Sequence, residues 1–458
     1  MDSEYYLKKY LQNEILLKSN CIISNFCEKS VKNIKSQKII QPFEYLEISG
    51  VSLKNFEYSK KEILPSEIPD RATYLLQNND VVVSMVRPNR NAIAFIQNEK
   101  MLVGTSGFAI LRNNGKISPQ YLFAFCKTKH FITKLMRENT ATMYPSVSER
   151  EVFSMPIPIL TEEFRNIISK NIQFGIDKLK QSRNLYTDSE SLLLSSLGLS
   201  DFKPSTDSIA IKPLSESFCV SGRMDAEYYQ KKYEDIVAAI KCSNGVSPLT
   251  SNQTYRNQRR DSVATPLGDL VKFTKSIEPG SEYYGDEGVP FIRVSDLSKF
   301  GINEPEIKIP EKIVDPHLYL KKDTILLSKD GSVGIAYKLE EDKSSVTSGA
   351  LLHLKVISDV LPDYLTLVLN SFIVQMQAQR DTGGSVIPHW RPEEIKEVLI
   401  PIVDANIQDQ ISDLVQRSFS LRRESERLLE SAKKGVEIAI EEGEDVAMEY
   451  LLKLTSCQ

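Results

Sequence analysis

Hydrophobic and polar residues alternate in several short stretches of this 458-residue chain. Tyr45–Ser49 and Phe291–Ser295 alternate with a period of two, which is typical of a strand with one buried face. The segments Asp80–Ser84 and Asp323–Ser328 enclose short apolar runs, which indicate buried strands. These strands fall into two regions of the chain, so we expect two separate modules of mixed helix and strand.

A seven-residue periodicity follows each of these regions. The stretches begin after Thr161 and Asp404, whose side chains can cap a helix N-terminus. Each stretch is about 35 residues long, which makes a helix of roughly 50 Å. The apolar columns are Ile172, Leu179, Tyr186 and Leu193 in the first helix, and Val415, Arg422, Leu429 and Val436 in the second. Beside them run small residues: Gly175, Ser182 and Ser189, then Ser418, Ser425 and Ala432. Small residues on a seam let two helix backbones approach closely, so we expect a paired coiled coil rather than two helices that each cover a globular core.

The chain is an internal duplication. Met1–Tyr10 and Met224–Tyr233 are identical at eight of ten positions. Further matches follow in the same order, because Thr105–Gly107 recurs at Thr347–Gly349 and prolines recur 243 positions apart. The second copy is 23 residues longer before its first strand, and we place the extra residues at the polar run Ser251–Ser262.

Composition and charge exclude several classes of protein. Hydrophobic residues make up 41% and charged residues 26%, so wholesale disorder is excluded, and the apolar runs are far shorter than a membrane span. The six cysteines include no C-x-x-C pair, and the first residues are polar, so we expect a cytoplasmic protein without a leader peptide. The net charge is −4, but it is uneven: residues 401–458 carry −5, which leaves +1 for the remainder and allows a local basic surface.

Motifs of catalysis are missing from the sequence. There is no P-loop, no glycine-rich dinucleotide fingerprint, no adenine-methyltransferase loop and no histidine pair with metal-ligand spacing. One nuclease-like pattern joins Asp363 to Glu394 and Lys396, where two acids and a lysine could hold a metal and a water. This pattern is common by chance, and a second E-x-K stands at Glu306–Lys308. We therefore expect neither a catalytic nor a metal site.

Several segments together resemble the specificity subunit of type I restriction–modification systems. They cover nearly the whole second half and are RMDAEYY at Arg223–Tyr229, FIRVSDL at Phe291–Leu297, DTILLSKDGSVG at Asp323–Gly334, TSGA at Thr347–Ala350, Gly383–Ile402 and QDQI at Gln408–Ile411. The first half matches more loosely, because Met85–Arg90 stands where the second half has Lys329–Gly334 and lacks its glycines.

The resemblance implies an α+β protein with two similar target recognition domains, each reading one half of a split site in double-stranded DNA. The domains would occupy residues 1–160 and 223–403. Two antiparallel helices, at 161–200 and 404–458, would set the gap between half-sites, and residues 201–222 would form a linker. The subunit itself would hold no cofactor. It would recruit methyltransferase subunits, expected to be two, that bind S-adenosylmethionine, and in many systems a restriction subunit.

Arginine, lysine, asparagine and short hydroxyl side chains reach phosphates and base edges, so residues with such side chains in the predicted loops are candidates for DNA contact. In the first module these are Arg87, Asn89, Arg90, Tyr144, Ser146 and Ser148. In the second they are Arg256, Arg259, Arg260, Arg293, Lys329, Asp330, Ser332, His389 and Arg391. Plain solvated turns explain the loops after the strands equally well, and a disordered loop explains the basic run at 255–260. We expect Trp390, the single tryptophan, to lie in the core.

Two other functions stay open at this point. The chain could be a scaffold whose helices join proteins without DNA, or a nuclease that uses Asp363, Glu394 and Lys396. A third possibility, close to the main one, is the recognition subunit of a phage-defence system that methylates DNA but lacks the usual nuclease.

Overall fold

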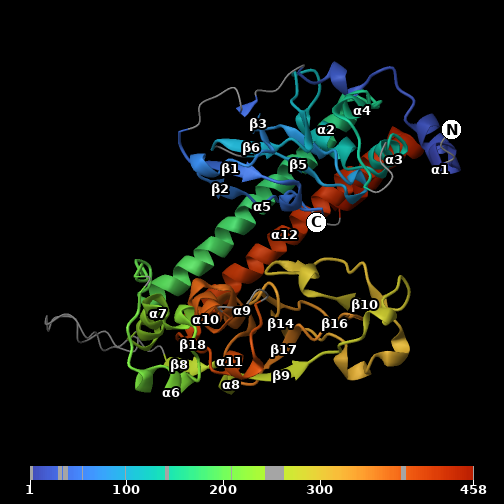
Figure 1. The fold of residues 1–458 in the computed structure, drawn as a ribbon. Coiled ribbons are helices and arrows are strands. Elements are labelled where there is room, and N and C mark those ends of the chain that lie inside the picture. Colours follow the sequence, from blue (N-terminus) through green and yellow to red (C-terminus); the bar gives the residue numbers. More distant parts are fainter. Residues whose placement is uncertain are drawn as a thin grey trace. The chain divides into compact units, whose positions relative to one another are not determined.

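The computed structural model describes residues 4–28, 33–34, 40–53, 55–97, 100–139, 144–207, 209–242, 263–382 and 388–456. The chain divides into two compact units (Figure 1). Unit 1 contains residues 1–182 and 420–458, and unit 2 contains residues 183–419. Unit 1 is therefore built from both ends of the chain, whereas unit 2 is continuous.

Unit 1 contains two small sheets. The first has the order β2 (Lys61–Ile63), β1 (Phe43–Leu46), β6 (Leu102–Thr105), β3 (Ala72–Leu76), and only the β1–β6 pair is parallel. The second is antiparallel, with the order β5 (Ile93–Phe95), β4 (Val81–Ser84), β7 (Phe108–Leu111). Every residue of these last three strands is buried, in agreement with the apolar run predicted at 80–84.

Unit 1 also contains several shorter helices. They are α1 (Lys8–Leu16), α2 (Pro119–Cys126), α3 (Lys129–Arg137), α4 (Glu149–Phe153) and α13 (Glu444–Ser456). Of these, α2 and α4 pack against the second sheet. Ser118 and Thr128 accept hydrogen bonds from the backbone N–H groups of Tyr121 and Phe131, and so cap α2 and α3. Phe123 of α2 packs beside Phe95 of β5, with ring centroids 5.6 Å apart. Helix α2 is thus a core helix rather than a surface one.

Unit 2 has a larger antiparallel sheet with the order β15 (Ala336–Lys338), β14 (Ile325–Ser328), β17 (Leu351–Val356), β9 (Val271–Lys275). A three-stranded sheet places β10 (Val289–Ile292) between antiparallel β13 (Lys308–Ile309) and parallel β16 (Val346–Thr347). Two strand pairs complete the unit: β8 (Val263–Pro266) with β18 (Leu399–Ile402), and β11 (Leu297–Ser298) with β12 (Gly301–Ile302).

The helices of unit 2 are α6 (Phe218–Ser221), α7 (Lys231–Cys242), α8 (Leu267–Leu270), α9 (Pro362–Asn370), α10 (Phe372–Thr382) and α11 (Pro392–Lys396). Four of them follow the order of α1 to α4 in unit 1, namely α7, α9, α10 and α11. Tyr364 of α9 is fully buried, and its hydroxyl donates to the Pro401 carbonyl oxygen at 2.6 Å. Tyr121 of α2 makes the matching bond to the Pro158 carbonyl oxygen at 2.8 Å.

The two modules repeat each other element by element. Helices α2, α3, α4 and the long α5 (Glu162–Leu197) begin 243 positions before α9, α10, α11 and the long α12 (Ala405–Glu441). Isolated bridges in the first module also match whole strand pairs in the second, since Ile22–Pro156 corresponds to the β8–β18 pair. The predicted α+β duplication is confirmed. The offset grows from 223 at α1 and α7 to 244 at Ile22 and Pro266, so most of the extra length lies between α7 and β8. The run Ser251–Ser262 lies outside the described residues.

The long helices pack together antiparallel, as expected. In unit 1 the Ser425 hydroxyl donates to the Gly175 carbonyl oxygen at 2.6 Å, and Lys178 pairs with Glu424 at 3.0 Å. In unit 2, Leu193 near the end of α5 shares a core with Ile411 near the start of α12. The predicted apolar columns are buried, and so are the small side chains Ser182, Ser189, Ser418, Ser425 and Ala432. A Cβ atom at Gly175 would lie 2.6 Å from the Phe56 ring, so a larger residue at this position would have to displace that ring.

One position in the column of α12 is occupied by an arginine, which forms an ion pair instead of an apolar contact. The Arg422 side chain is only 4% exposed, and it forms a two-pronged ion pair with Glu57, with one nitrogen–oxygen distance of 3.0 Å. Asn55 in the same β1–β2 connection bonds to Glu426 at 3.3 Å. These contacts fix the β1–β2 connection to α12 within unit 1.

Each module also holds its own N-terminal segment in the same way. The Arg137 guanidinium of α3 lies 4.2 Å from the centre of the Tyr5 ring. The Arg380 guanidinium of α10 lies 5.2 Å from the Tyr228 ring, which is the duplicated position. The repeated motif D-x-E-Y-Y therefore supplies the aromatic residue that docks the start of each module through a cation–π contact.

Candidate nucleic-acid interface

The two candidate segments of each module lie side by side. In the first module Val86 forms a β-bridge with Ser146, and the Arg87 N–H donates to the Pro145 carbonyl oxygen at 2.7 Å. In the second module Asp330 forms the equivalent bridge with His389, and the Gly331 N–H donates to the Pro388 carbonyl oxygen at 2.9 Å. The structure thus joins segments that are about 60 residues apart in the sequence into one double loop per module.

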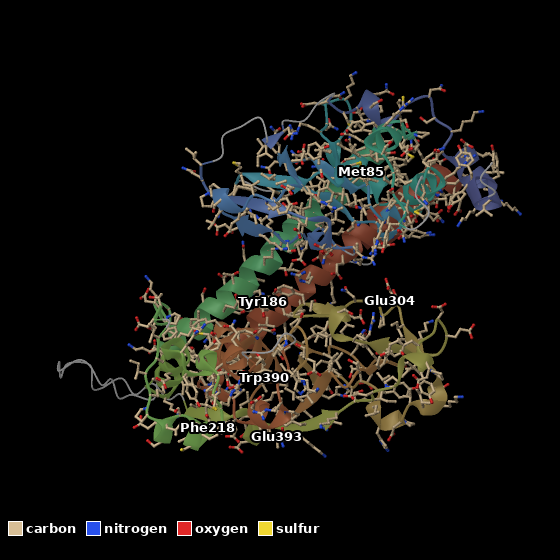
Figure 2. The ribbon with its side chains drawn as sticks, viewed as in Figure 1. Met85, Tyr186, Phe218, Glu304, Trp390 and Glu393 are labelled. Carbon is tan, nitrogen blue, oxygen red and sulfur yellow. The ribbon has the colours of Figure 1, made fainter. Side chains whose placement is uncertain are left out.

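The loop after β4 in the first module is cationic and exposed. Met85 leads into it (Figure 2). The Arg87 guanidinium lies 4.9 Å from the centre of the Tyr144 ring, whose residue is 57% exposed. Asn89 and Arg90 are exposed in the short 3₁₀ turn that follows. Guanidinium, amide and aromatic groups therefore meet on one accessible surface.

Arg87 adopts a left-handed backbone conformation, with φ of 51°. The equivalent residue of the second module, Gly331, has φ of 70°. The loop shape is thus kept although the glycine is absent, at a cost of roughly 1–2 kcal/mol for a residue with a side chain.

A buried lysine, Lys127, forms hydrogen bonds with the end of this loop. The Lys127 side chain donates to the carbonyl oxygens of Asn91, at 3.1 Å, and of Leu53, at 3.3 Å. The Asn91 side chain donates in turn to the Lys127 carbonyl oxygen at 3.0 Å. Burial lowers the pKa of Lys127 to about 8. Sequence reasoning missed this residue, since a lone lysine between two helices carries no signal that it supports a loop.

The two candidate serines of the first module have structural tasks. The Ser146 N–H donates to the Asn139 side chain at 2.9 Å. Ser148 caps α4, with its hydroxyl accepting a bond from the Glu151 N–H. The capping bond explains the serine at 148, whereas the bond at Ser146 comes from its backbone.

The loop of the second module carries a chain of charges. The Lys329 ammonium lies 2.6 Å from a carboxylate oxygen of Asp330, and the other oxygen bonds to Nδ1 of His389. Lys329 is buried, whereas His389 is exposed. The Ser332 carbonyl oxygen accepts a bond from the Ser328 hydroxyl at 2.6 Å. This loop therefore presents a carboxylate and an imidazole where the first module presents guanidinium groups.

The remaining candidates are more scattered. Arg391 is exposed at the start of α11 and pairs with Glu394. Trp390 (Figure 2), the residue before Arg391, is fully buried as expected. Its Nε1–H donates to Asp381 at 3.2 Å. Arg293, which follows β10, lies 3.9 Å from Asp296, and no contact joins it to the double loop among the described residues. The candidates Arg256, Arg259 and Arg260 lie outside the described residues.

The nuclease pattern finds no support in the described part of the chain. Asp363 is buried and bonds to Lys338 at 2.9 Å, while Glu394 pairs with Arg391 and Arg223. No group of three histidine, cysteine, aspartate or glutamate side chains among the described residues could hold a metal ion. Within the same residues, no helix is long and apolar enough to cross a membrane.

Comparisons with known proteins give one family match and several similar solved structures. Residues 260–430 match the family model for the type I restriction modification DNA specificity domain. No curated protein matches the chain. Similar solved structures include one on complex assembly and conformational transition of the type I R-M system, which is 18% identical, covers 90% of this chain and 96% of that chain, and has a TM-score of 0.32.

Two further solved structures cover most of the chain. The HsdS subunit from Thermoanaerobacter tengcongensis is 17% identical, with 92% of this chain and 96% of that chain covered and a TM-score of 0.33. The S subunit of a type I restriction-modification system from M. genitalium is 13% identical, with 94% and 95% covered and a TM-score of 0.36. The resemblance found in the sequence is confirmed by the family match: residues 260–430, which include most of the second module and of α12, match the type I restriction modification DNA specificity domain.

Proposed function

We propose that this chain is the DNA-recognition subunit of a type I system and that its two modules read the two halves of a split site in double-stranded DNA. One observation carries the proposal: the family match covers most of the second module, and helices α2 to α5 of the first half repeat those of the second at an offset of 243. A protein with two copies of one reading unit fits a target with two half-sites.

The double loops are the proposed contacts with DNA. In the first module, Arg87, Asn89 and Arg90 supply the guanidinium and amide groups that pair with guanine and adenine edges or with phosphates. In the second module, Asp330 and His389 accept or donate hydrogen bonds at base edges, and Arg391 reaches phosphate. The different side chains of the two loops support half-sites of different sequence, because a carboxylate favours the cytosine amino group and a guanidinium favours guanine.

The long helices are the proposed spacer, and the partners are the proposed catalysts. The paired α5 and α12 set the number of unread base pairs between half-sites. Two methyltransferase subunits, which carry S-adenosylmethionine, bind to the subunit and modify the DNA, and a restriction subunit joins where the system has one. The chain itself performs no catalysis and works in the cytoplasm.

Methylome mapping tests this function directly. The chain is expressed with its methyltransferase in cells without other DNA methylation, and methylated bases are located across the genome. The expected result is a bipartite motif with a fixed gap. Methylation without such a motif, or a partner that methylates equally well without this chain, would refute the proposal.

A binding experiment separates DNA recognition from a protein scaffold. The complex is titrated with DNA that contains the mapped motif, at salt concentrations from 50 to 200 mM. Recognition through phosphate contacts predicts an affinity that falls steeply with salt, by about 0.9 decades per decade of salt for each phosphate contacted. A scaffold that only joins proteins predicts no motif-dependent binding. The presence or absence of a restriction gene beside this one then separates a restriction system from a related defence system that methylates.

A further inference from the structure

The loop that follows β4 and the loop that follows β14 are each fixed at both ends. The first runs from Arg87 to Asn91 and the second from Gly331 to Gly334, and all four end residues have a positive φ, of 51°, 56°, 70° and 85° respectively. We call these segments the reading loops. At the start of each loop, the backbone N–H group bonds to a proline carbonyl oxygen. At the end of each loop, a side chain from the adjoining helices holds the backbone carbonyl oxygen. The proposed DNA-contacting residues between these fixed points are Asn89, Arg90 and Ser332.

Lys127 holds the end of the first reading loop. It follows α2 directly, is only 3% exposed, and donates from its ammonium group to the Asn91 carbonyl oxygen at 3.1 Å. The same ammonium group donates to the Leu53 carbonyl oxygen at 3.3 Å. Both acceptors are neutral, so burial of this cation costs free energy that an apolar side chain would not cost. This cost favours a role in holding the loop over a role in stabilising the core.

The second module holds its reading loop with a different residue. Gln375 of α10 donates from its side-chain amide to the Gly334 carbonyl oxygen at 2.8 Å. The residue equivalent to Lys127 at the offset of 243 is Asn370, which bonds to the first residue of β15 instead. The residue equivalent to Gln375 is Ile132, whose side chain has no donor. The two modules therefore place a donor on the same loop carbonyl group from two different positions, which indicates that the loop requires the bond itself.

In the first module, the same lysine also connects the reading loop to a long helix. Leu53, the second partner of Lys127, belongs to the β1–β2 connection. This connection is fixed to α12 by the ion pair between Glu57 and Arg422. All of these residues lie in unit 1. The end of the reading loop is therefore held relative to α12, and Lys127 is the side chain that bridges the two.

We propose that Lys127 and Gln375 are positioning residues for DNA reading, each holding one reading loop in the shape in which its side chains meet the base edges. The inference rests on the proposed function of the double loops. Recognition of a base edge requires hydrogen-bonding groups held to within about 0.5 Å, which depends on the bonds behind them. A loop that loses one of its two fixed points takes up several positions, so it binds the correct base and an altered base more nearly alike.

Binding to DNA altered in one half-site tests the proposal. The chain, in complex with its methyltransferase, is titrated with DNA that contains the mapped motif and with DNA in which one half is altered. The ratio of the two dissociation constants is the discrimination at that half. Lys127→Met and Gln375→Met each keep an unbranched side chain and remove the donor. Each should lower discrimination at one half by about fivefold or more, the lower limit of what one specific base contact contributes, and the two should act on opposite halves.

Gln120→Met is the matched control. Gln120 lies in α2, the helix that precedes Lys127, but it bonds to Gln173 of α5 at 3.2 Å and not to the reading loop. This variant also loses a side-chain hydrogen bond, and it should keep full discrimination at both halves. In each variant, the unaffected half reports that the complex is folded. A purely structural role of Lys127 would instead weaken binding without regard to the half that is altered.

Three results would overturn the inference: full discrimination in Lys127→Met, an equal loss at both halves, or a loss at the same half as in Gln375→Met. If Lys127→Met does not assemble with the methyltransferase, Gln375→Met decides alone, since it should lose one half and keep the other. A wild-type complex that discriminates at neither half would refute the proposed function. Normal discrimination by the wild type and by both variants would refute this inference alone.

Discussion

The ion pair between Arg422 and Glu57 gives the sharpest stability prediction. We expect Arg422→Leu, which completes the apolar column of α12, to destabilise the protein although leucine is the better seam residue. The reason is that Glu57, whose side chain is 23% exposed, would lose the guanidinium that neutralises it. Breaking a buried pair costs 3–5 kcal/mol, and the partial exposure of Glu57 reduces this to about 2–3 kcal/mol.

A double-mutant cycle measures the coupling. Glu57→Leu alone leaves a buried arginine without its carboxylate and should cost a similar amount. The double variant should recover most of the loss, because two apolar side chains replace the pair without leaving a charge. Urea unfolding followed by circular dichroism reports the whole chain, and fluorescence of Trp390 reports unit 2 separately. A coupling energy below about 0.5 kcal/mol would refute the reasoning, since the pair would then be no stronger than an exposed one.

Three further predictions concern DNA reading, spacing and pH. Arg87→Gly should weaken binding to one half-site by about 1–3 kcal/mol while stabilising the fold slightly, because glycine suits the left-handed backbone; Arg391→Ala should affect the other half-site, and both effects are measured with DNA altered in one half at a time. Insertion of seven residues into α5 should lengthen it by roughly 10 Å and widen the methylated motif by about three base pairs; an unchanged gap in the methylome would show that the helices are not the spacer. Burial lowers the pKa of His353 from 6.5 to about 4, so the unfolded chain binds a proton between these values that the folded chain does not. Stability should therefore fall as the pH falls from about 6.5 to 4, by roughly 3 kcal/mol at most, and His353→Gln should flatten the pH dependence of the urea midpoint.

The periodic parts of the fold could be predicted from sequence, because their burial follows from spacing alone. The seven-residue columns of α5 and α12 are buried as expected, and Thr161 and Asp404 cap these helices through bonds to Phe164 and Ile407. The duplication predicted two modules, since repeated sequence folds into repeated structure.

Contacts between distant residues could not be predicted in the same way. Arg422 stands in an apolar column, and only the fold brings Glu57 to it. The β-bridges that join the candidate loops depend on tertiary structure, so sequence reasoning proposed the two segments separately. The base that each loop reads stays a prediction, because side-chain chemistry limits the choice of base but the position of the DNA decides it.

The division of unit 1 between both ends of the chain has a consequence for fragments of the protein. Residues 1–182 alone would expose Ile168, Ile172 and Leu179, which are buried in the same core as Leu429 and Val436 of α12. An N-terminal half produced by itself would therefore have to find a second helix, either from a separately made C-terminal half or from another N-terminal half, before it could complete its core. Splitting the gene between α5 and the second module should yield two polypeptides that each aggregate when made alone and stay soluble when made together. A single continuous chain makes this pairing intramolecular. During synthesis, the first module therefore completes its core only after α12, near the end of the chain, has been made.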